Sequence, residues 1–129
     1  MPQITHLALK VDDVEAATVL YEKVFGFKYD RTIQSKGHIS RQLSIGDFSI
    51  ALMQYESEEA PEALFSGPGP CIHHFGVEVD DMGKYLEEIK KAGCEILGGS
   101  PEKPPIKFRT PDGIVAELQP SGRFAKKGA

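Results

Sequence analysis

The chain has 129 residues, of which 40% are hydrophobic and 26% are charged, a balance typical of a folded globular protein. The net charge of −4 is spread over both signs, which argues against nucleic acid as a partner because no basic surface is indicated. No segment has the roughly 18 consecutive apolar residues of a membrane-spanning helix, and no signal-peptide pattern is present. We therefore expect a cytoplasmic protein that does not bind membranes.

The first half of the chain predicts one strand, one helix and three further strands. An alternating strand at residues 4–11 ends at Asp12 and Asp13, which can cap a helix. Apolar residues then recur at helical spacing, at Val14, Ala17, Leu20, Tyr21 and Val24, until Gly26 ends the pattern. The three strands are expected at residues 28–33, 39–45 and 48–55, with Gly46-Asp47 as a hairpin turn.

The second half repeats this order after a segment rich in proline and glycine at residues 56–70, which has the composition of a linker. A strand at residues 72–79 ends at Asp80 and Asp81, and a helix with an apolar stripe follows as far as Gly93. The remaining strands are expected at residues 95–97, 106–109 and 114–119. The basic cluster of Arg123, Lys126 and Lys127 is predicted to be a solvated end, and Cys71 and Cys94 to be small buried side chains.

The two halves align with each other. Residues 4–14 match residues 72–82 at an offset of 68, with an identical Val-Asp-Asp and a histidine at the same place. Residues 46–52 match residues 112–118 at an offset of 66. Two modules that each bury too little apolar surface alone are expected to share one structure. We predict a single α+β domain over residues 1–129, with βαβββ module one at 3–55, a linker at 56–70, module two at 71–120 and a tail at 121–129.

Three side chains suited to metal binding occupy the same face of their strands. Alternation places Leu7, Leu9 and Val11 under the helix, and hence His6 on the opposite face. The same parity puts His74 opposite Phe75, Val77 and Val79, and Glu117 opposite Ile114, Ala116 and Leu118. Two imidazoles and a carboxylate suit a divalent transition metal and leave positions open for a substrate. The alternative is that the histidines are satisfied core residues and that Glu117 pairs with a lysine. By parity His73 belongs to the apolar side and is expected to be structural.

These features resemble the vicinal-oxygen-chelate superfamily, which includes glyoxalases, methylmalonyl-CoA epimerase, extradiol dioxygenases, and the fosfomycin-resistance and bleomycin-resistance proteins. The resemblance covers residues 3–120 and rests on Thr5-His6-Leu7, the helix end at Gly26-Phe27, His74 before Val-Asp-Asp, and Asp112-Gly113 followed by Glu117-Leu118. It implies a cup-shaped, largely antiparallel sheet with the helices on its outer face, a metal held by His6, His74 and Glu117, a small oxygen-chelating metabolite as substrate, and a homodimer.

One position departs from the family pattern. The glyoxalases and the epimerase carry Glu or Gln at the symmetry mate of Glu117, where this chain has Ala51. The remaining two histidines and one glutamate resemble the facial triad of extradiol dioxygenases. The first interpretation is therefore a ring-cleaving dioxygenase that uses Fe(II), with Zn, Ni, Mn or Co as other possible metals.

Two other functions stay open. A glyoxalase-like or epimerase-like lyase or isomerase would need a separate general base, for which the candidates are Glu78, His38, Gln42 and Gln119. A non-catalytic protein resembling the bleomycin-resistance members would only sequester a ligand, and retention of all three metal residues argues against it. Three strand cations, at Arg41, Lys107 and Arg109, could hold an anionic substrate but are more typical of solvated strand edges.

Overall fold

A computed structural model describes residues 1–35 and 37–122. The basic cluster Arg123, Lys126 and Lys127 lies outside these residues. The chain forms two compact units: the first comprises residues 6–73, and the second comprises residues 1–5 together with the chain from residue 74 onward. Neither of the helices in the described residues has the length and apolar character needed to cross a bilayer.

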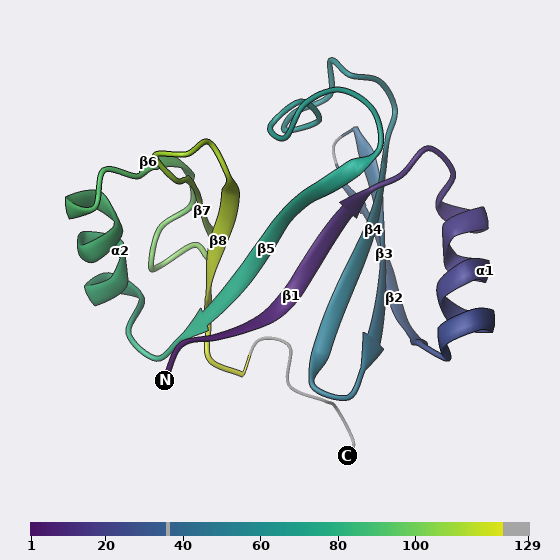
Figure 1. Cartoon of the computed structure of the whole chain (residues 1–129), viewed down its shortest axis with the longest axis horizontal. Coiled ribbons are helices and arrows are strands. Elements are labelled where there is room, and N and C mark those ends of the chain that lie inside the picture. The colour runs from purple at the N-terminus through teal and green to yellow at the C-terminus, as the bar shows by residue number, and fades with distance from the viewer. Residues whose placement is uncertain (36, 123–129) are drawn as a thin grey trace. The chain divides into compact units, whose positions relative to one another are not determined.

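The first unit contains most of β1 (Gln3–Lys10), followed by α1 (Val14–Phe25) and three strands (Figure 1). These strands are β2 (Lys28–Ser35), β3 (His38–Ile45) and β4 (Phe48–Tyr55). They form the order β2-β3-β4-β1, in which β1 and β4 are parallel and the other neighbours are antiparallel. The long-range parallel pair therefore brings the first strand of the module beside its last strand.

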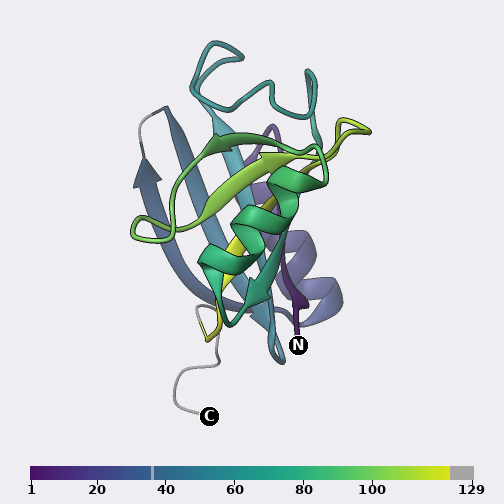
Figure 2. The ribbon, with the colours of Figure 1, turned by 90° about the vertical axis from the view of Figure 1, so that its left-hand side faces the viewer.

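The second unit has the same arrangement. Its elements are β5 (Cys71–Val79), which begins in the first unit, α2 (Met82–Lys91), β6 (Glu95–Gly98), β7 (Ile106–Arg109) and β8 (Val115–Pro120). Their order is β5-β8-β7-β6, with β5 and β8 parallel and the others antiparallel. Figure 2 shows α2 lying over one face of these strands. The predicted α+β class and the two βαβββ modules are thus confirmed.

Both helices begin directly after the second aspartate of an Asp-Asp pair, which serves as the N-cap. The side chain of Asp13 accepts hydrogen bonds from the backbone N–H groups of Glu15 and Ala16, and Asp81 accepts one from Lys84. Gly26 ends α1 with a φ of 73°, a conformation that a residue with a side chain seldom adopts. These local caps fix where each strand gives way to its helix.

Each helix covers an apolar sheet face. Val14 of α1 packs with Leu43, Ile50 and Leu52, while Ala116 and Leu118 of β8 form the core under α2. The spacing of apolar residues correctly predicted α1, but Leu20 and Val24 do not belong to its buried face, since they are 47% and 64% exposed. At about 100° per residue, these two positions lie well away from Val14 on the helix surface, and the narrow buried stripe passes through Thr18 instead.

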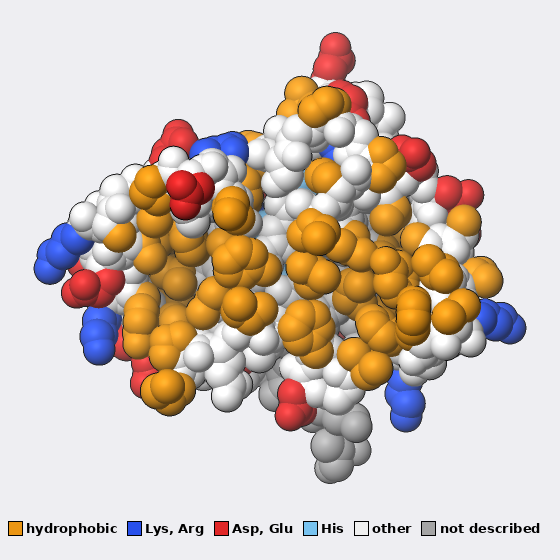
Figure 3. All heavy atoms as spheres, viewed as in Figure 1, with side chains coloured by type: hydrophobic (Ala, Val, Ile, Leu, Met, Phe, Trp, Pro, Cys, Tyr) orange, Lys and Arg blue, Asp and Glu red, His pale blue; other side chains and the backbone are white. Residues whose placement is uncertain are grey.

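Ile114 was predicted to share the buried face of β8 but is 54% exposed. The strand begins one residue later, at Val115. Apolar side chains are also visible at the surface of each unit in Figure 3.

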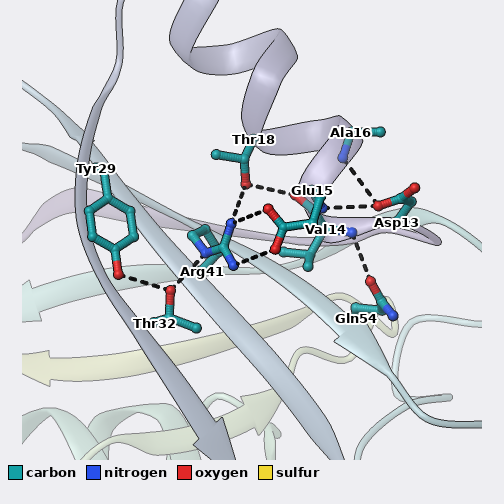
Figure 4. Close-up of polar contacts among 9 residues, drawn as sticks. All are labelled: Asp13, Val14, Glu15, Ala16, Thr18, Tyr29, Thr32, Arg41 and Gln54. Carbon is teal, nitrogen blue, oxygen red and sulfur yellow. Dashed lines mark hydrogen bonds and ion pairs between the residues drawn. The ribbon is translucent and has the colours of Figure 1, made fainter.

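An ion pair fastens α1 to its sheet. Arg41 of β3 donates two hydrogen bonds to the carboxylate of Glu15, at 3.0 and 2.9 Å, and a third to Thr32 at 2.7 Å (Figure 4). The guanidinium of Arg41 lowers the pKa of the Glu15 carboxyl, and Glu15 in turn raises the pKa of Arg41. Arg41 therefore has a structural partner rather than an open position for a substrate.

The segment at residues 56–70 is more than a linker, because it is anchored from within the first unit. The buried ammonium group of Lys10 donates to the backbone carbonyls of Ala63 at 2.7 Å and Gly67 at 2.8 Å, and it lies 3.3 Å from Glu58. The imidazole Nε2 of His73 lies 2.7 Å from the carbonyl of Glu62. His73 thus has the structural surroundings that its parity predicts.

Candidate metal centre

His74 and Glu117 meet in the second unit. They lie on the parallel neighbours β5 and β8, where Gly76 pairs with Glu117. The imidazole Nε2 of His74 lies 3.3 Å from Oε2 of Glu117, and the two side chains are only 4% and 5% exposed. A buried imidazole beside a buried carboxylate forms two of the three donors expected from the sequence.

Both oxygens of the Glu117 carboxylate have protein partners. Oε1 accepts a hydrogen bond from Nε2 of Gln119, two residues further along β8. Oε2 lies 3.7 Å from the ammonium nitrogen of Lys107, which is opposite Glu117 in the β7–β8 ladder. A buried anion requires such compensation, and Lys107 supplies the opposite charge.

His6 belongs to the first unit. Its side chain is 4% exposed, and in the parallel β1–β4 ladder it pairs with Ser49. Two residues further on, Ala8 pairs with Ala51, just as Gly76 pairs with Glu117 in the other ladder. By register, Ala51 and His6 in the first unit therefore correspond to Glu117 and His74 in the second unit.

The surroundings of Ala51 are largely apolar. Ala8, Ala51 and Met53 form a buried cluster against which Tyr55 packs, and Gln42 lies opposite Ala51 in the β3–β4 ladder. Burial, with a smaller contribution from the carboxylate of Glu62, raises the pKa of the Tyr55 hydroxyl well above its ordinary value. Tyr55 therefore stays protonated at neutral pH and can donate a hydrogen bond but cannot serve as a base.

The four candidates for a general base lie in different places. Glu78 pairs with Gln119, beside Glu117, and its two oxygens accept hydrogen bonds from the hydroxyl of Thr5 and the backbone N–H of Gly122. His38 lies opposite Tyr55 on β4. Tyr55 is six residues from Ser49, the partner of His6, which is a distance of roughly 20 Å along the strand. Gln42 and Gln119 carry amides, which do not titrate.

The sequence alternative paired Glu117 with a lysine without saying which one, and Lys107 was interpreted as a solvated edge residue. Its side chain is only 14% exposed. The available signal was the antiparallel register of the last two strands, which sets Lys107 against Glu117. Gln54 of β4 accepts a hydrogen bond from the backbone N–H of Val14 at 2.8 Å and so supports α1.

Comparison with known proteins agrees with this architecture. The ethylmalonyl-CoA/methylmalonyl-CoA epimerase of Cereibacter sphaeroides is 27% identical over 91% of this chain and 96% of its own length. The mitochondrial methylmalonyl-CoA epimerase of Dictyostelium discoideum is 23% identical over 91% of this chain and 77% of its own length. A crystallised variant of the Streptomyces coelicolor methylmalonyl-CoA epimerase, in complex with 2-nitronate-propionyl-CoA, superposes with a TM-score of 0.78 at 20% identity, covering 93% of this chain and 97% of that one.

The family model described as the glyoxalase, bleomycin resistance protein and dioxygenase superfamily matches residues 3–118. This match covers nearly all of the residues that form both βαβββ modules. The chain belongs to the glyoxalase/bleomycin resistance protein/dioxygenase superfamily.

Proposed function

We propose that this protein is a metal-dependent epimerase or isomerase that acts on a carbon acid next to a carbonyl group, with a short acyl-CoA thioester as the first substrate class to test. The buried pair of His74 and Glu117 carries the proposal, and the epimerase relatives, matched along 91% of the chain, support it. They favour the epimerase alternative over the ring-cleaving dioxygenase that was the first interpretation of the sequence.

We infer that His6, His74 and Glu117 together hold the metal. All three side chains are buried, and two neutral imidazoles with one carboxylate are a donor set for Fe(II), Co, Ni, Mn or Zn. When bound, such a metal supplies a Lewis acid that stabilises negative charge on a carbonyl oxygen of the substrate. The protein's own part is to hold these donors in place, and at Glu117 a hydrogen bond from Gln119 does so.

Glu78 is the side chain that we propose as the proton carrier. Of the two titratable candidates, Glu78 lies nearer than His38 to the proposed metal ligands. It is two residues from Gly76, which pairs with Glu117, and this spacing is about 7 Å along the strand. Its carboxylate would accept the proton from the substrate carbon, leaving the electron pair of the C–H bond delocalised onto the neighbouring carbonyl. A water molecule on the opposite face then donates a proton to that carbon, and Glu78 gives up its own proton to the hydroxide left behind, which completes an epimerisation.

The metal is tested by measuring bound metal in protein purified without a nickel column. We expect about one divalent ion per chain in the wild type and a loss of at least 100-fold in affinity in His74→Ala and His74→Asn. His38→Ala is the matched control and should keep the metal, since His38 pairs with Tyr55 and His6 pairs with Ser49, six residues away on β4. Wild-type protein that binds no divalent ion would contradict the proposal.

The reaction is tested by exchange of the substrate α-proton for deuterium in D2O with methylmalonyl-CoA. Glu78→Gln should slow this exchange by about 10²-fold to 10⁴-fold while retaining the metal. Thr5→Val is the control, because it removes the hydrogen bond to Glu78 but not the carboxylate. Equal loss in both variants would assign Glu78 a structural role, and oxygen uptake with catechols in place of exchange would restore the dioxygenase interpretation.

The homodimer and the cytoplasmic location expected from the sequence remain predictions. Light scattering coupled to size-exclusion chromatography tests the first of them, and fractionation of the source cells tests the second.

A further inference from the structure

Within the described residues, Gln119 has one amide atom with a hydrogen-bond partner and one without. It lies on β8 two residues after Glu117, so both side chains emerge on the same face of the strand. Only 1% of its surface is exposed. Its amide nitrogen donates to Oε1 of Glu117, yet its carbonyl oxygen, also buried, accepts no hydrogen bond from the described residues, 1–35 and 37–122.

The orientation of this amide is set by Glu117. A carboxylate only accepts hydrogen bonds, so the NH2 group of Gln119 must face it, and a reversed amide would place two oxygens together. The carbonyl oxygen is therefore held in place as an acceptor. A buried acceptor without a donor destabilises the folded state, a penalty that an apolar side chain at this position would avoid.

The first unit provides such an apolar side chain. Gln119 pairs with Glu78 in its ladder, and the corresponding pair in the first unit is Lys10 with Met53. Met53 is an unbranched side chain of similar length and is 6% exposed. The same place in the fold thus accommodates methionine, which indicates that packing alone does not require an amide at position 119.

We propose that Gln119 is a positioning residue of the metal centre, an inference that rests on the proposed function. Its NH2 group holds Oε1 of Glu117 and leaves Oε2, the oxygen nearer to His74, to face the metal. Its carbonyl oxygen accepts a hydrogen bond from a donor that enters with the metal, such as a water or the N–H or O–H of a substrate. Partners of this kind orient metal ligands, and their loss commonly lowers metal affinity 10-fold to 100-fold.

The experiment uses Gln119→Met, which introduces the residue of the first unit. Co(II) is titrated into the metal-free protein, and the visible absorption of the bound ion reports both its affinity and its coordination. We expect affinity to fall 10-fold to 100-fold and the absorption bands to shift, while thermal unfolding of the metal-free protein changes little. Gln34→Met, at an exposed position, is the matched control and should match the wild type in both respects.

Gln119→Asn is the second variant, should the methionine variant fail to fold, because it keeps the amide but is too short to reach Glu117. The same loss of affinity is expected. Wild-type affinity and an unchanged spectrum in a folded position-119 variant would overturn the role of Gln119. If His74→Ala still lost Co(II) binding, the proposed metal site would stand without that role. Absence of Co(II) binding in the wild type would instead overturn the proposed function.

Discussion

The two units carry different side chains at three positions that correspond by strand register. The second unit has Glu117, Gln119 and Lys107 at these positions. The first unit has Ala51, Met53 and Gln42. Of the residues proposed for the metal centre, only the histidines, His6 and His74, are kept in both units. The repeated fold therefore supplies two equivalent places for a carboxylate, of which one is used. A polar cluster around Glu117 and an apolar cluster around Ala51 show that backbone symmetry does not dictate chemical symmetry.

The largest expected effect is on the free energy of unfolding, when a glycine in a hairpin connection of either unit is replaced by alanine. A Cβ on Gly99, which follows β6 and has a φ of 85°, would lie 1.8 Å from the carbonyl oxygen of Pro105. On Gly37, which precedes β3, a Cβ would lie 3.0 Å from the Cβ of Ala60. We expect Gly99→Ala to lower the free energy of unfolding by about 3 kcal/mol or more, and Gly37→Ala by about 1–2 kcal/mol.

Urea denaturation of both variants measures this difference, with Gly98→Ala as the control because an added Cβ there meets nothing within 4 Å. Equal losses of unfolding free energy in Gly99→Ala and Gly37→Ala would contradict the prediction. They would mean that the backbone near Pro105 shifts to make room for the added Cβ.

Restoring the missing carboxylate tests the equivalence of the two ladders directly. Ala51→Glu should destabilise the metal-free protein, because position 51 is buried and a buried carboxylate needs a partner. It should also tighten divalent metal binding by about 10-fold or more if the new carboxylate becomes a ligand. Isothermal titration with Zn(II) or Co(II) measures the change. Ala51→Leu fills the space without offering a ligand and should give no gain, and an unchanged affinity in Ala51→Glu would break the equivalence.

A smaller effect is expected from exchanging the cation beside Glu117 for its first-unit counterpart. Lys107→Gln removes a positive charge 3.7 Å from the Glu117 carboxylate, a charge that opposes the binding of a second cation to the same oxygen. Metal affinity should rise about 3-fold to 10-fold, as measured by competition with a chelator, whereas Lys103→Gln at an exposed site should leave it unchanged. A fall in affinity would mean that Lys107 supports the geometry of Glu117 more than it opposes the metal.

The smallest effect concerns the ion pair that fastens α1, since position 83, the counterpart of Glu15 in the second unit, is a glycine. The pKa of Glu15 is lowered in the folded state, so its contribution to stability is present above the ordinary carboxyl pKa of 4.5 and is lost as pH falls through the lower folded value. Glu15→Gln should therefore lower the urea midpoint slightly at pH 7 and not at pH 2. A difference that persisted in acid would assign the effect to packing.

Features set by nearby residues could be predicted from the sequence. Alternation and helical spacing located the strands and helices, the aspartates marked the helix starts, and the repeat identified Ala51 as the mate of Glu117. Features set by strand register across the sheet could not. The contact of Lys107 with Glu117 depends on pairing between β7 and β8, and the exposure of Leu20 depends on how α1 is rotated against its sheet. Residue type alone specifies neither.

The contacts of Lys10 determine where the chain can be cut to produce the first unit alone. The ammonium group of Lys10 holds the backbone of residues 63 and 67 from inside the first unit, and that unit extends to residue 73. A half-length protein based on module one would therefore need to continue past Tyr55 to residue 73. A chain cut at the sequence repeat would leave a buried cation without the carbonyl groups that solvate it.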